Sequence, residues 1–409
     1  MVTGVSAFRP QTAGSVILWG VLGISLGLVV RALVAPQRRS GKLCIGSPAK
    51  TQLPKLSAEG TSALSYPPDV LPGSRDVETS YGSIKVFEWG PRDGEKVLML
   101  HGISTPCLSQ ANLGEALVAR GYRVMIFDFF GRGYSDAPSD LPYDIRLFTT
   151  QILLVLASSS VAWTGDDGFH LIGYSLGGGL AVPFAKHFPH MVRSLILIAG
   201  GGLIRTEHQS WKSKFLYSTG TLPGWILETL VRWRISPNGA VTETKMASEA
   251  VDPKPQRNSD ASGGSSYDNA TLLMRRPGHT VSSVMKWQIA NHEGFITAFI
   301  SSIRHAPIYE QREDWLALGR LLADRRQDAE SSEDERSPAA LPGLRGGRAL
   351  LVLGSTDSVI IKEELIHDAT AVLGEDGFET VILECGHEIV MTRGDEIAAL
   401  AANFWRSNE

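Results

Sequence analysis

The sequence predicts an α/β protein with a mostly parallel central sheet flanked by helices, an inserted helical cap and an N-terminal transmembrane helix. Three observations predict it. Short apolar runs alternate with helical stretches, this alternation stops between residues 199 and 349, and an uncharged apolar stretch lies near the N-terminus. The chain has 409 residues, 43 % hydrophobic and 20 % charged, a composition typical of a globular protein with a large core. We therefore expect one catalytic domain with insertions.

The N-terminal stretch over residues 15–35 reads SVILWGVLGISLGLVVRALVA and carries no charge from Ser15 to Val30. Its length is close to the roughly 20 residues that cross a bilayer. A cleaved signal peptide would have a shorter apolar region before a small-residue cleavage site. A hairpin or an interfacial segment is a further alternative. We expect a retained single-pass membrane anchor over residues 1–35.

The orientation of this anchor follows from its flanking charges. Only Arg9 precedes the apolar stretch, whereas Arg31, Arg38, Arg39 and Lys42 lie at its end or after it. Positive residues favour the cytoplasmic side, which places the catalytic domain in the cytosol. The sequon at Asn269 would matter only in a lumen, and such sequons are frequent by chance.

A linker is predicted over residues 36–75, which are rich in Pro, Ser, Gly and Lys. The α/β core is predicted to follow in two parts, residues 76–202 and 345–409. An edge hairpin is expected around residues 79–88, where the pattern alternates.

Buried parallel strands are expected where short apolar runs are continuous, because both faces of such strands are covered. These runs are residues 96–100, 122–127, 169–174, 194–199, 349–354 and 379–384. Helices are expected between or after them, over residues 112–120, 176–187, 362–373 and 396–405.

A helical cap is predicted over residues 203–306, which are rich in Trp and aliphatic residues with helical spacing. Its polar part, about 252–268, resembles a disordered loop. Residues 307–344 are expected to form a connector, and a second charged low-complexity run covers residues 324–348. We interpret both polar runs as solvated insertions.

The strongest chemical motif is Gly173-Tyr174-Ser175-Leu176-Gly177, which follows an apolar strand and opens an apolar helix. This context is that of a nucleophile elbow, in which a sharp turn exposes the serine oxygen. The two glycines leave room where side chains would collide with the neighbouring strands and helix. The motif predicts Ser175 as a nucleophile.

A serine nucleophile needs a histidine base, which in turn needs a carboxylate to orient it. His387 follows the last predicted strand and Asp357 follows the strand before it, which places both at the carboxyl edge of the sheet. We expect His387 as base and Asp357 as its orienting carboxylate. The rival histidines are His292, His305 and His367, and the rival carboxylates are Glu363 and Glu364, which we expect to be solvated.

The oxyanion of an acyl transfer needs two backbone donors. We expect the N–H of Leu176, directly after the nucleophile, and that of Ile103, in the loop after the strand at 96–100. His101 in the same loop is expected to be structural.

Taken together, these motifs resemble the α/β-hydrolase fold superfamily over roughly residues 77–406. The matching segments are residues 100–102, 128–136, 173–177 and 386–387 together with Asp357, and residues 294–304 are similar to the return helix after the cap. The resemblance implies the fold and the triad but not the substrate. A serine at the nucleophile position argues against relatives of haloalkane dehalogenases and epoxide hydrolases. An anchor followed by this domain is similar in layout to membrane-bound monoacylglycerol lipases.

The expected activity is hydrolysis of a lipid-like or other hydrophobic ester through an acyl-enzyme. The cap residues Trp211, Trp225, Trp233 and Trp287 suggest an apolar pocket, unless they pack the cap itself. Carbon–carbon hydrolysis, thioester hydrolysis and acyl transfer to an alcohol use the same triad and remain open. A receptor or carrier of a hydrophobic ligand, without turnover, is an alternative of another class.

The remaining composition bounds partners and cofactors. A net charge of −4 gives no indication of nucleic-acid binding. The three cysteines, Cys44, Cys107 and Cys385, are too few and too widely spaced for a disulfide framework or a metal site, so we expect free thiols. No metal and no organic cofactor are expected, and the expected partners are a hydrophobic ester and the membrane.

Overall fold

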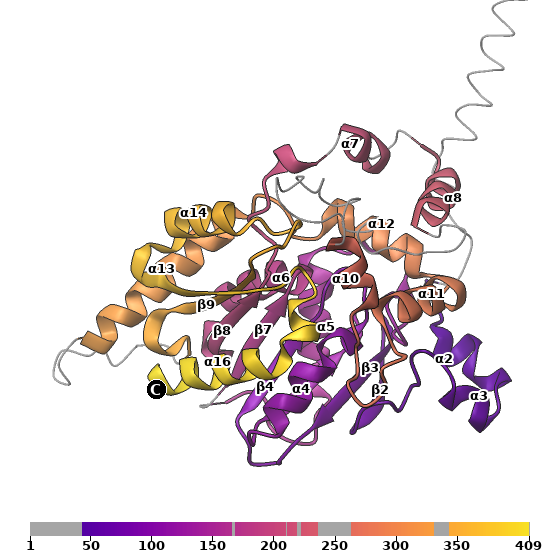
Figure 1. The fold of residues 1–409 in the computed structure, drawn as a ribbon, viewed down its shortest axis with the longest axis horizontal. Coiled ribbons are helices and arrows are strands. Elements are labelled where there is room, and N and C mark those ends of the chain that lie inside the picture. The colour runs from indigo at the N-terminus through magenta and orange to yellow at the C-terminus, as the bar shows by residue number, and fades with distance from the viewer. Residues whose placement is uncertain are drawn as a thin grey trace, which may run out of the picture.

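The computed structural model describes residues 43–165, 168–209, 211–218, 222–235, 263–330 and 343–408 (Figure 1). The predicted anchor over residues 1–35 lies outside these ranges. Among the helices that are described, none is long and apolar enough to cross a membrane.

The core is an eight-stranded sheet in the order β10-β9-β8-β7-β4-β5-β3-β2. Only β2 and β3 run against their neighbours, and the other strands are mutually parallel. The strands are β2 (Ser74–Thr79), β3 (Gly82–Trp89), β4 (Lys96–Leu100), β5 (Arg123–Phe127), β7 (Phe169–Tyr174), β8 (Val192–Ile198), β9 (Ala349–Gly354) and β10 (Phe378–Leu383). The predicted strands thus agree with the structure to within a few residues, because strands covered on both faces are apolar throughout.

Helices cover both faces of this sheet (Figure 1). On one face α4 (Ala111–Val118) lies beside α15 (Ile389–Thr392) and α16 (Gly394–Ser407). On the other face α6 (Leu176–His187) contacts α5 (Ile145–Ala157) and α13 (Arg312–Glu330), and α14 (Lys362–Leu373) packs on α13. Helix α13 continues to Glu330, so the first residues of the predicted low-complexity insertion are helical, while residues 331–342 lie outside the described ranges.

The cap between β8 and α13 is helical, as expected. Its elements are η4 (Thr206–His208), α7 (Trp211–Tyr217), α8 (Gly224–Ile235), α10 (Gly263–Asn269), α11 (Val281–Asn291) and α12 (Phe295–His305). Helix α10 occupies the end of the segment expected to be a disordered loop, and residues 252–262 lie outside the described ranges.

The tryptophans of the cap do not form one apolar pocket. Trp287 is buried, but the side chains of Trp225 and Trp233 are 57 % and 76 % exposed. The side chain of Trp211 lies outside the described part of the chain. Trp225 and Trp233 therefore neither line a shared substrate pocket nor pack the interior of the cap.

Residues 43–72, called the strap below, pack on the core, whereas the sequence predicted a linker over residues 36–75. The strap contains β1 (Cys44–Ile45), which pairs with β6 (Ala137–Pro138), and the short helices α2 (Pro48–Thr51), η1 (Leu53–Lys55) and α3 (Ala58–Ser62). The Asp136 carboxylate accepts hydrogen bonds from the Ser47 N–H at 2.8 Å and from the Lys50 ammonium at 2.7 Å. Composition alone did not reveal this packing.

The strap also contacts the cap. The Tyr66 ring meets the Trp287 ring of α11 edge-on with centroids 5.7 Å apart, and its hydroxyl donates to the buried Asp128 carboxylate. The loop before α11 reaches back, since Arg275 donates to the Val70 carbonyl. The strap therefore joins core and cap.

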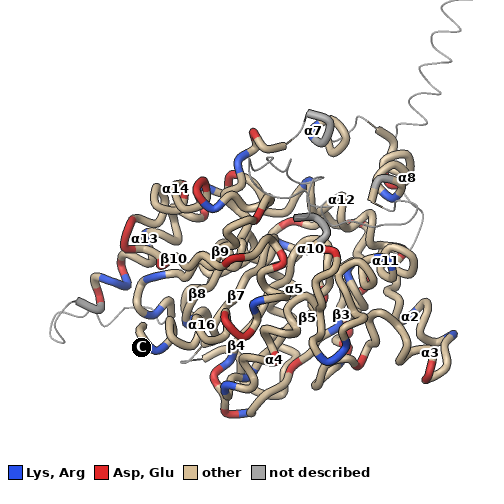
Figure 2. Tube along the Cα trace, in the orientation of Figure 1, with Lys and Arg blue, Asp and Glu red and all other residues tan. Residues whose placement is uncertain are grey.

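Charged residues of both signs are interspersed over the described elements (Figure 2). Most buried charges are paired: Glu88 on β3, for example, accepts from Arg123 at 2.7 Å and from Arg75 at 2.9 Å. Burying such groups is tolerable because each has a charged partner.

Candidate active site

Three residues from three loops meet at the carboxyl edge of the parallel strands. Ser175 follows β7, Asp357 follows β9 and His387 follows β10. The His387 Nε2 lies 3.0 Å from the Ser175 Oγ, and the His387 Nδ1 lies 2.7 Å from the Asp357 Oδ2. The structure thus brings together the three side chains that the sequence proposed as nucleophile, base and orienting carboxylate.

Ser175 sits at a strained turn. Its φ of 52° and ψ of −119° are unusual for a non-glycine residue, and such strain is retained at functional sites. A Cβ on Gly177 would come 2.1 Å from the Leu100 carbonyl oxygen, and one on Gly173 would come 2.4 Å from the Gly177 oxygen. Glycine at both positions therefore allows the tight strand-to-helix turn that exposes the Ser175 hydroxyl.

Asp357 is almost fully buried at 3 % exposure, and both of its carboxylate oxygens are engaged. Oδ1 accepts from the N–H groups of Val359 and Ile360 at 2.8 and 2.9 Å. Oδ2 faces His387, whose Nδ1–H donates to it. With the proton on Nδ1, the His387 Nε2 is free to accept the proton of Ser175.

Two tyrosines that the sequence did not single out hold the base. The Tyr174 hydroxyl donates to the His387 carbonyl at 2.8 Å, and its ring lies 5.3 Å from the imidazole. Tyr267, on cap helix α10, stacks on the same imidazole with centroids 6.0 Å apart. Tyr174 lies inside the motif itself, but Tyr267 is 92 residues after Ser175 in sequence and carried no pattern that could identify it.

The two expected oxyanion donors lie beside the nucleophile. Leu176 is the first residue of α6, and the first N–H groups of a helix have no partner within it. The loop that carries Ile103 touches Ser175, because a Cβ on the adjacent Gly102 would lie 3.5 Å from the Ser175 Cβ. Leu176 therefore adjoins the nucleophile directly, and the loop of Gly102 and Ile103 lies next to it.

Arg132 orients the Ile103 peptide. The side chain is fully buried, and its Nε donates to the Ile103 carbonyl at 3.0 Å while a terminal nitrogen donates to the Ser302 hydroxyl at 2.8 Å. Burial lowers the pKa of Arg132 to about 10, so the guanidinium keeps its charge at neutral pH. Sequence reasoning placed Arg132 in a matching segment but gave it no role.

His101 is a structural residue, as expected. The Phe129 N–H donates to its Nε2 at 2.9 Å, which leaves the proton on Nδ1 to bond the Gly102 carbonyl at 2.7 Å. Burial lowers the pKa of His101 to about 3. The neutral ring thus fixes the oxyanion loop and cannot serve as a base for Ser175.

The rival histidines lie elsewhere. His292 is buried and bonds the Ser135 carbonyl through Nε2 at 2.9 Å, and burial lowers its pKa to about 4. His305 ends α12, and His367 is exposed on α14.

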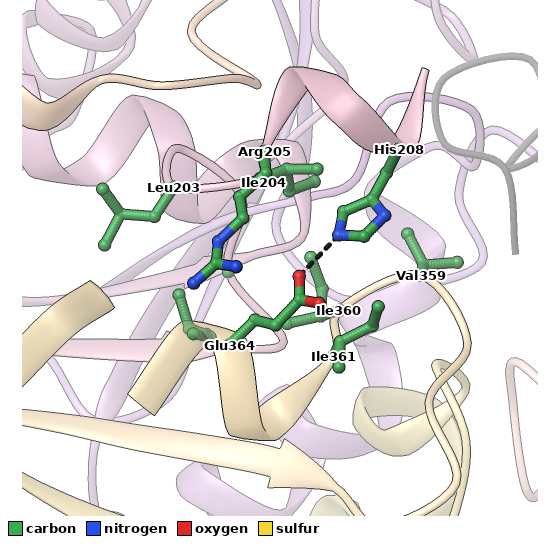
Figure 3. Close-up of a pocket in the computed structure, with 10 residues that line it drawn as sticks. Leu203, Ile204, Arg205, His208, Val359, Ile360, Ile361 and Glu364 are labelled. Carbon is green, nitrogen blue, oxygen red and sulfur yellow. Dashed lines mark hydrogen bonds and ion pairs between the residues drawn. The ribbon is translucent and has the colours of Figure 1, made fainter. Parts of the chain in front are cut away.

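A small pocket adjoins the Asp357 loop (Figure 3). Apolar side chains of the cap entrance and of residues 359–361 line it, together with Arg205, His208 and Glu364. It encloses about 20 Å³, roughly room for one water molecule. Glu364, expected to be solvated, instead meets the His208 Nε2 at 2.5 Å across this pocket, while Glu363 remains exposed beside Lys362.

Glu207, His208 and Glu364 bring three potential metal-ligand atoms within 4.8 Å of one another. The donor set fits a metal poorly, because His208 and Glu364 already bond each other and the Arg205 guanidinium lies 3.7 Å from Glu207. A resident cation at that place would repel a divalent ion. We assign no metal to this cluster.

The cysteines are free, as expected: Cys107 is buried, and Cys44 and Cys385 are half-buried. Burial raises the pKa of Cys385, two residues before His387, to about 11. A thiol that stays protonated is a poor nucleophile, so Cys385 is a weak rival to Ser175.

Comparison with known proteins identifies the family. A family model described as alpha/beta hydrolase fold matches residues 96–393. A serine hydrolase-like protein of Danio rerio is 30 % identical over 128 residues, which cover 31 % of this chain and 37 % of that protein. A 2-hydroxy-6-oxononadienedioate/2-hydroxy-6-oxononatrienedioate hydrolase of Klebsiella pneumoniae is 38 % identical over 112 residues, covering 26 % of this chain and 36 % of that protein. The chain thus aligns with less than two fifths of the length of these relatives.

Solved structures share the fold at low identity. A membrane phospholipase A, 18 % identical, aligns over 96 % of this chain and 97 % of its own with a TM-score of 0.52. A 2-hydroxy-6-oxo-6-phenylhexa-2,4-dienoate hydrolase of Rhodococcus sp. strain RHA1, 16 % identical, aligns over 81 % of this chain and 98 % of its own with a TM-score of 0.53.

Proposed function

The chain belongs to the alpha/beta hydrolase fold family, and from that premise we propose that it is a serine hydrolase that cleaves hydrophobic, lipid-like carboxylic esters. The observation that carries the proposal is the hydrogen-bonded series Ser175–His387–Asp357. It is built on a strained elbow at the carboxyl edge of the sheet. A receptor or carrier would not need a serine held in this conformation.

Acylation begins when Ser175 attacks the ester carbonyl carbon and His387 Nε2 takes its proton. The carbonyl oxygen becomes an oxyanion, which the N–H groups of Leu176 and Ile103 stabilise. The tetrahedral intermediate then collapses, the C–O bond to the alcohol breaks, and His387 gives its proton to the leaving alkoxide. Asp357 stays ionised throughout and stabilises the imidazolium.

Deacylation repeats these steps with water as nucleophile. His387 takes a proton from water, the hydroxide attacks the acyl carbon, and the Ser175 oxygen leaves with the proton from His387. Carboxylic acid and free serine result.

The preference for hydrophobic esters rests on the surroundings of the triad. Tyr174 and Tyr267 pack beside the His387 imidazole, the loop of Gly102 adjoins Ser175, and the neighbouring pocket is lined mainly by apolar side chains. Apolar walls with few polar groups favour an apolar substrate. The predicted anchor over residues 1–35 supports the same choice, because it would hold the enzyme, with its domain in the cytosol, where lipid esters are abundant.

Carbon–carbon hydrolysis is the second candidate. The relative from Klebsiella pneumoniae named above carries a name for such a reaction, and a 2-hydroxy-6-oxo-2,4-heptadienoate hydrolase of Pseudomonas putida is 29 % identical over 112 residues. We rank it second because each alignment covers 27 % of this chain or less.

Labelling with a fluorophosphonate probe tests the proposal. We expect the wild type to be labelled and Ser175→Ala to be unlabelled, with ester turnover at least about 10³-fold lower in the variant. Short and long acyl esters and a 2-hydroxy-6-oxo-dienoate are offered in parallel, and added alcohol reveals acyl transfer. A folded wild type that resists the probe and turns over no substrate would refute the hydrolase.

A further inference from the structure

The outer face of the cap carries large apolar side chains that are exposed. Helix α8 presents Trp225, Leu230 and Trp233, each 41 to 76 % exposed. We call these three residues the cap face. Large exposed apolar side chains that gather on one element often mark an interaction site.

Helix α8 is apolar on two opposite sides. Leu227, Val231 and Ile235 are buried, spaced four residues apart, and α8 packs on α12. Trp225, Leu230 and Trp233 lie on the other side, where a helix on a water-exposed surface carries polar residues. Figure 1 shows α7 and α8 at the outer margin of the molecule. The second apolar side of α8 therefore needs a partner other than the core.

The chain enters the described structure next to α8. An open cleft of about 830 Å³ is lined by Cys44 and Ile45 of the strap and by Glu228 of α8. The seven residues from 36 to 42 separate the apolar stretch of the sequence from the strap, and a fully extended chain of that length spans at most about 25 Å. A bilayer that holds residues 15–35 must therefore lie close to α8.

We propose that the cap face rests in the interface of a lipid bilayer, as a second contact beside the N-terminal segment. Trp is the residue favoured at the headgroup level, because its ring is apolar and its N–H is polar. Lys214 on α7 is exposed and provides positive charge for anionic headgroups, and Arg232 on α8 is exposed although one of its nitrogens donates to the Ile289 carbonyl at 2.9 Å. The acidic residue of α8, Glu228, is turned away and bonds the Thr297 hydroxyl of α12 at 3.1 Å.

This contact would set the orientation of the catalytic domain. The cap lies over the carboxyl edge of the sheet, where Tyr267 covers His387. An ester dissolved in the bilayer would then reach Ser175 from the cap side without crossing water. This consequence rests on the proposed hydrolase function, whereas the membrane contact itself does not.

Fluorescence quenching tests the contact without using activity. The full chain is reconstituted in vesicles of phosphatidylcholine and phosphatidylserine that carry bromine near the headgroup. We expect bromine to quench less of the emission in the double variant W225F/W233F than in the wild type, because phenylalanine keeps the apolar surface but removes the two reporters. Equal quenching in both proteins would overturn the proposal. Trp19, within the apolar stretch, reports separately on residues 15–35.

A kinetic comparison tests the role of the contact. The triple variant W225S/L230S/W233S removes the cap face, and Ile382→Ser is the control, because Ile382 is also 46 % exposed but lies on β10, the edge strand of the sheet, and not on the cap. We expect the triple variant to hydrolyse a long-chain ester in vesicles at least about tenfold more slowly. A short soluble ester should be hydrolysed at the wild-type rate by both variants. Equal loss on both esters, or no loss on either, would contradict the proposal.

Two other occupants of the cap face are distinguishable. If a second copy covers it, the wild type is a dimer without vesicles and the triple variant is a monomer. If residues 236–262 of the same chain cover it, removal of the cap face alters neither quenching by brominated lipid nor the vesicle rate. Either result overturns the membrane contact. Failure of the hydrolase proposal can be told apart from these results, because even the wild type would then not hydrolyse the short soluble ester.

Discussion

Asp357 shows how one buried carboxylate decides the state of the base. It faces two backbone N–H donors and the His387 Nδ1, so the imidazole has one tautomer available to it. Asp357→Asn would present an amide that can stabilise the wrong tautomer. We expect the kcat for a short soluble ester to fall about 10³- to 10⁴-fold with little change in KM.

Unchanged thermal unfolding of Asp357→Asn would show that the loss is chemical and not structural. A loss of less than about tenfold would mean that another carboxylate orients His387. The neighbour to test would be Glu388, which is 8 % exposed and accepts the Gly386 N–H at 3.1 Å.

Arg132 holds the loop that carries Ile103 through the Ile103 carbonyl. Its planar guanidinium bonds Ile103 and Ser302 at once, a geometry that a lysine ammonium cannot reproduce. We predict that Arg132→Lys lowers kcat about 10- to 100-fold, because a misplaced Ile103 N–H is a weakened oxyanion donor. Steady-state kinetics on a short ester measures the effect.

Arg123→Lys is the matched control for Arg132→Lys. Arg123 is also buried and also bonds two groups, Glu88 and the Gly90 carbonyl, but it lies at the amino end of β5, opposite the carboxyl edge that carries the site. We expect Arg123→Lys to lower the free energy of unfolding without a comparable effect on kcat. If both variants lost kcat to the same extent, Arg132 would have no special role in placing the Ile103 N–H.

At the scale of elements, the turn between β7 and α6 leaves no space for side chains. We predict that Gly177→Ala destabilises the protein by about 1–3 kcal/mol or more, because the new Cβ would overlap the Leu100 carbonyl and force the strand or helix to shift. Chemical denaturation measures the loss. Gly278→Ala, where no atom lies within 4 Å of the new Cβ, should change the free energy of unfolding by less than about 0.5 kcal/mol.

The sequence alone located the strands that are covered on both faces, but it missed several elements at the surface. Strands β4 and β7 carry uninterrupted apolar runs, and the Ser175 elbow carries its own glycines, so sequence alone located them. Helix α13 was missed altogether, since residues 307–344 were expected to form a connector, because a charged surface helix and a low-complexity insertion have similar composition. The strap was missed because its packing depends on a few contacts, such as that of Tyr66 with Asp128.

The residues of the candidate site also fall into those that the sequence located and those that it did not. Ser175, Asp357 and His387 each follow a recognisable strand, so their meeting at one edge follows from the topology. Tyr267 has no such marker, since its place over His387 depends on how the cap folds back. The outward direction of Trp225 and Trp233 was equally hidden, because α8 carries large apolar residues on its exposed side as well as on its buried side and so has no single apolar face.

For the molecule as a whole, buried histidines predict a pH dependence of stability. Burial lowers the pKa of His101 to about 3 and that of His292 to about 4, against 6.5 for an unperturbed histidine. Below pH 6.5 the unfolded chain therefore binds more protons than the folded one, and the free energy of unfolding falls as the pH falls from 6.5 towards 4. Asp128, whose pKa is raised by burial, acts in the opposite direction.

The variant His292→Asn isolates one of these groups. It should show a flatter dependence of unfolding free energy on pH between 6.5 and 4, by up to about 1.4 kcal/mol for each unit of pKa shift removed. Urea titrations at pH 7, 6, 5 and 4 give the slopes of both proteins. Parallel slopes would mean that His292 becomes protonated without unfolding.

The strap has a practical consequence for how the enzyme can be divided. Its Ser65 carbonyl bonds His279 at 2.7 Å, and its Tyr66 ring covers Trp287. A shortened chain that starts at residue 76, where the sequence alone would cut, would expose that cap helix and leave the Asp128 carboxylate without its tyrosine. A chain that starts at residue 43 would keep both. The part of the chain needed for these contacts thus begins before Ser65, well ahead of the first strand of the sheet.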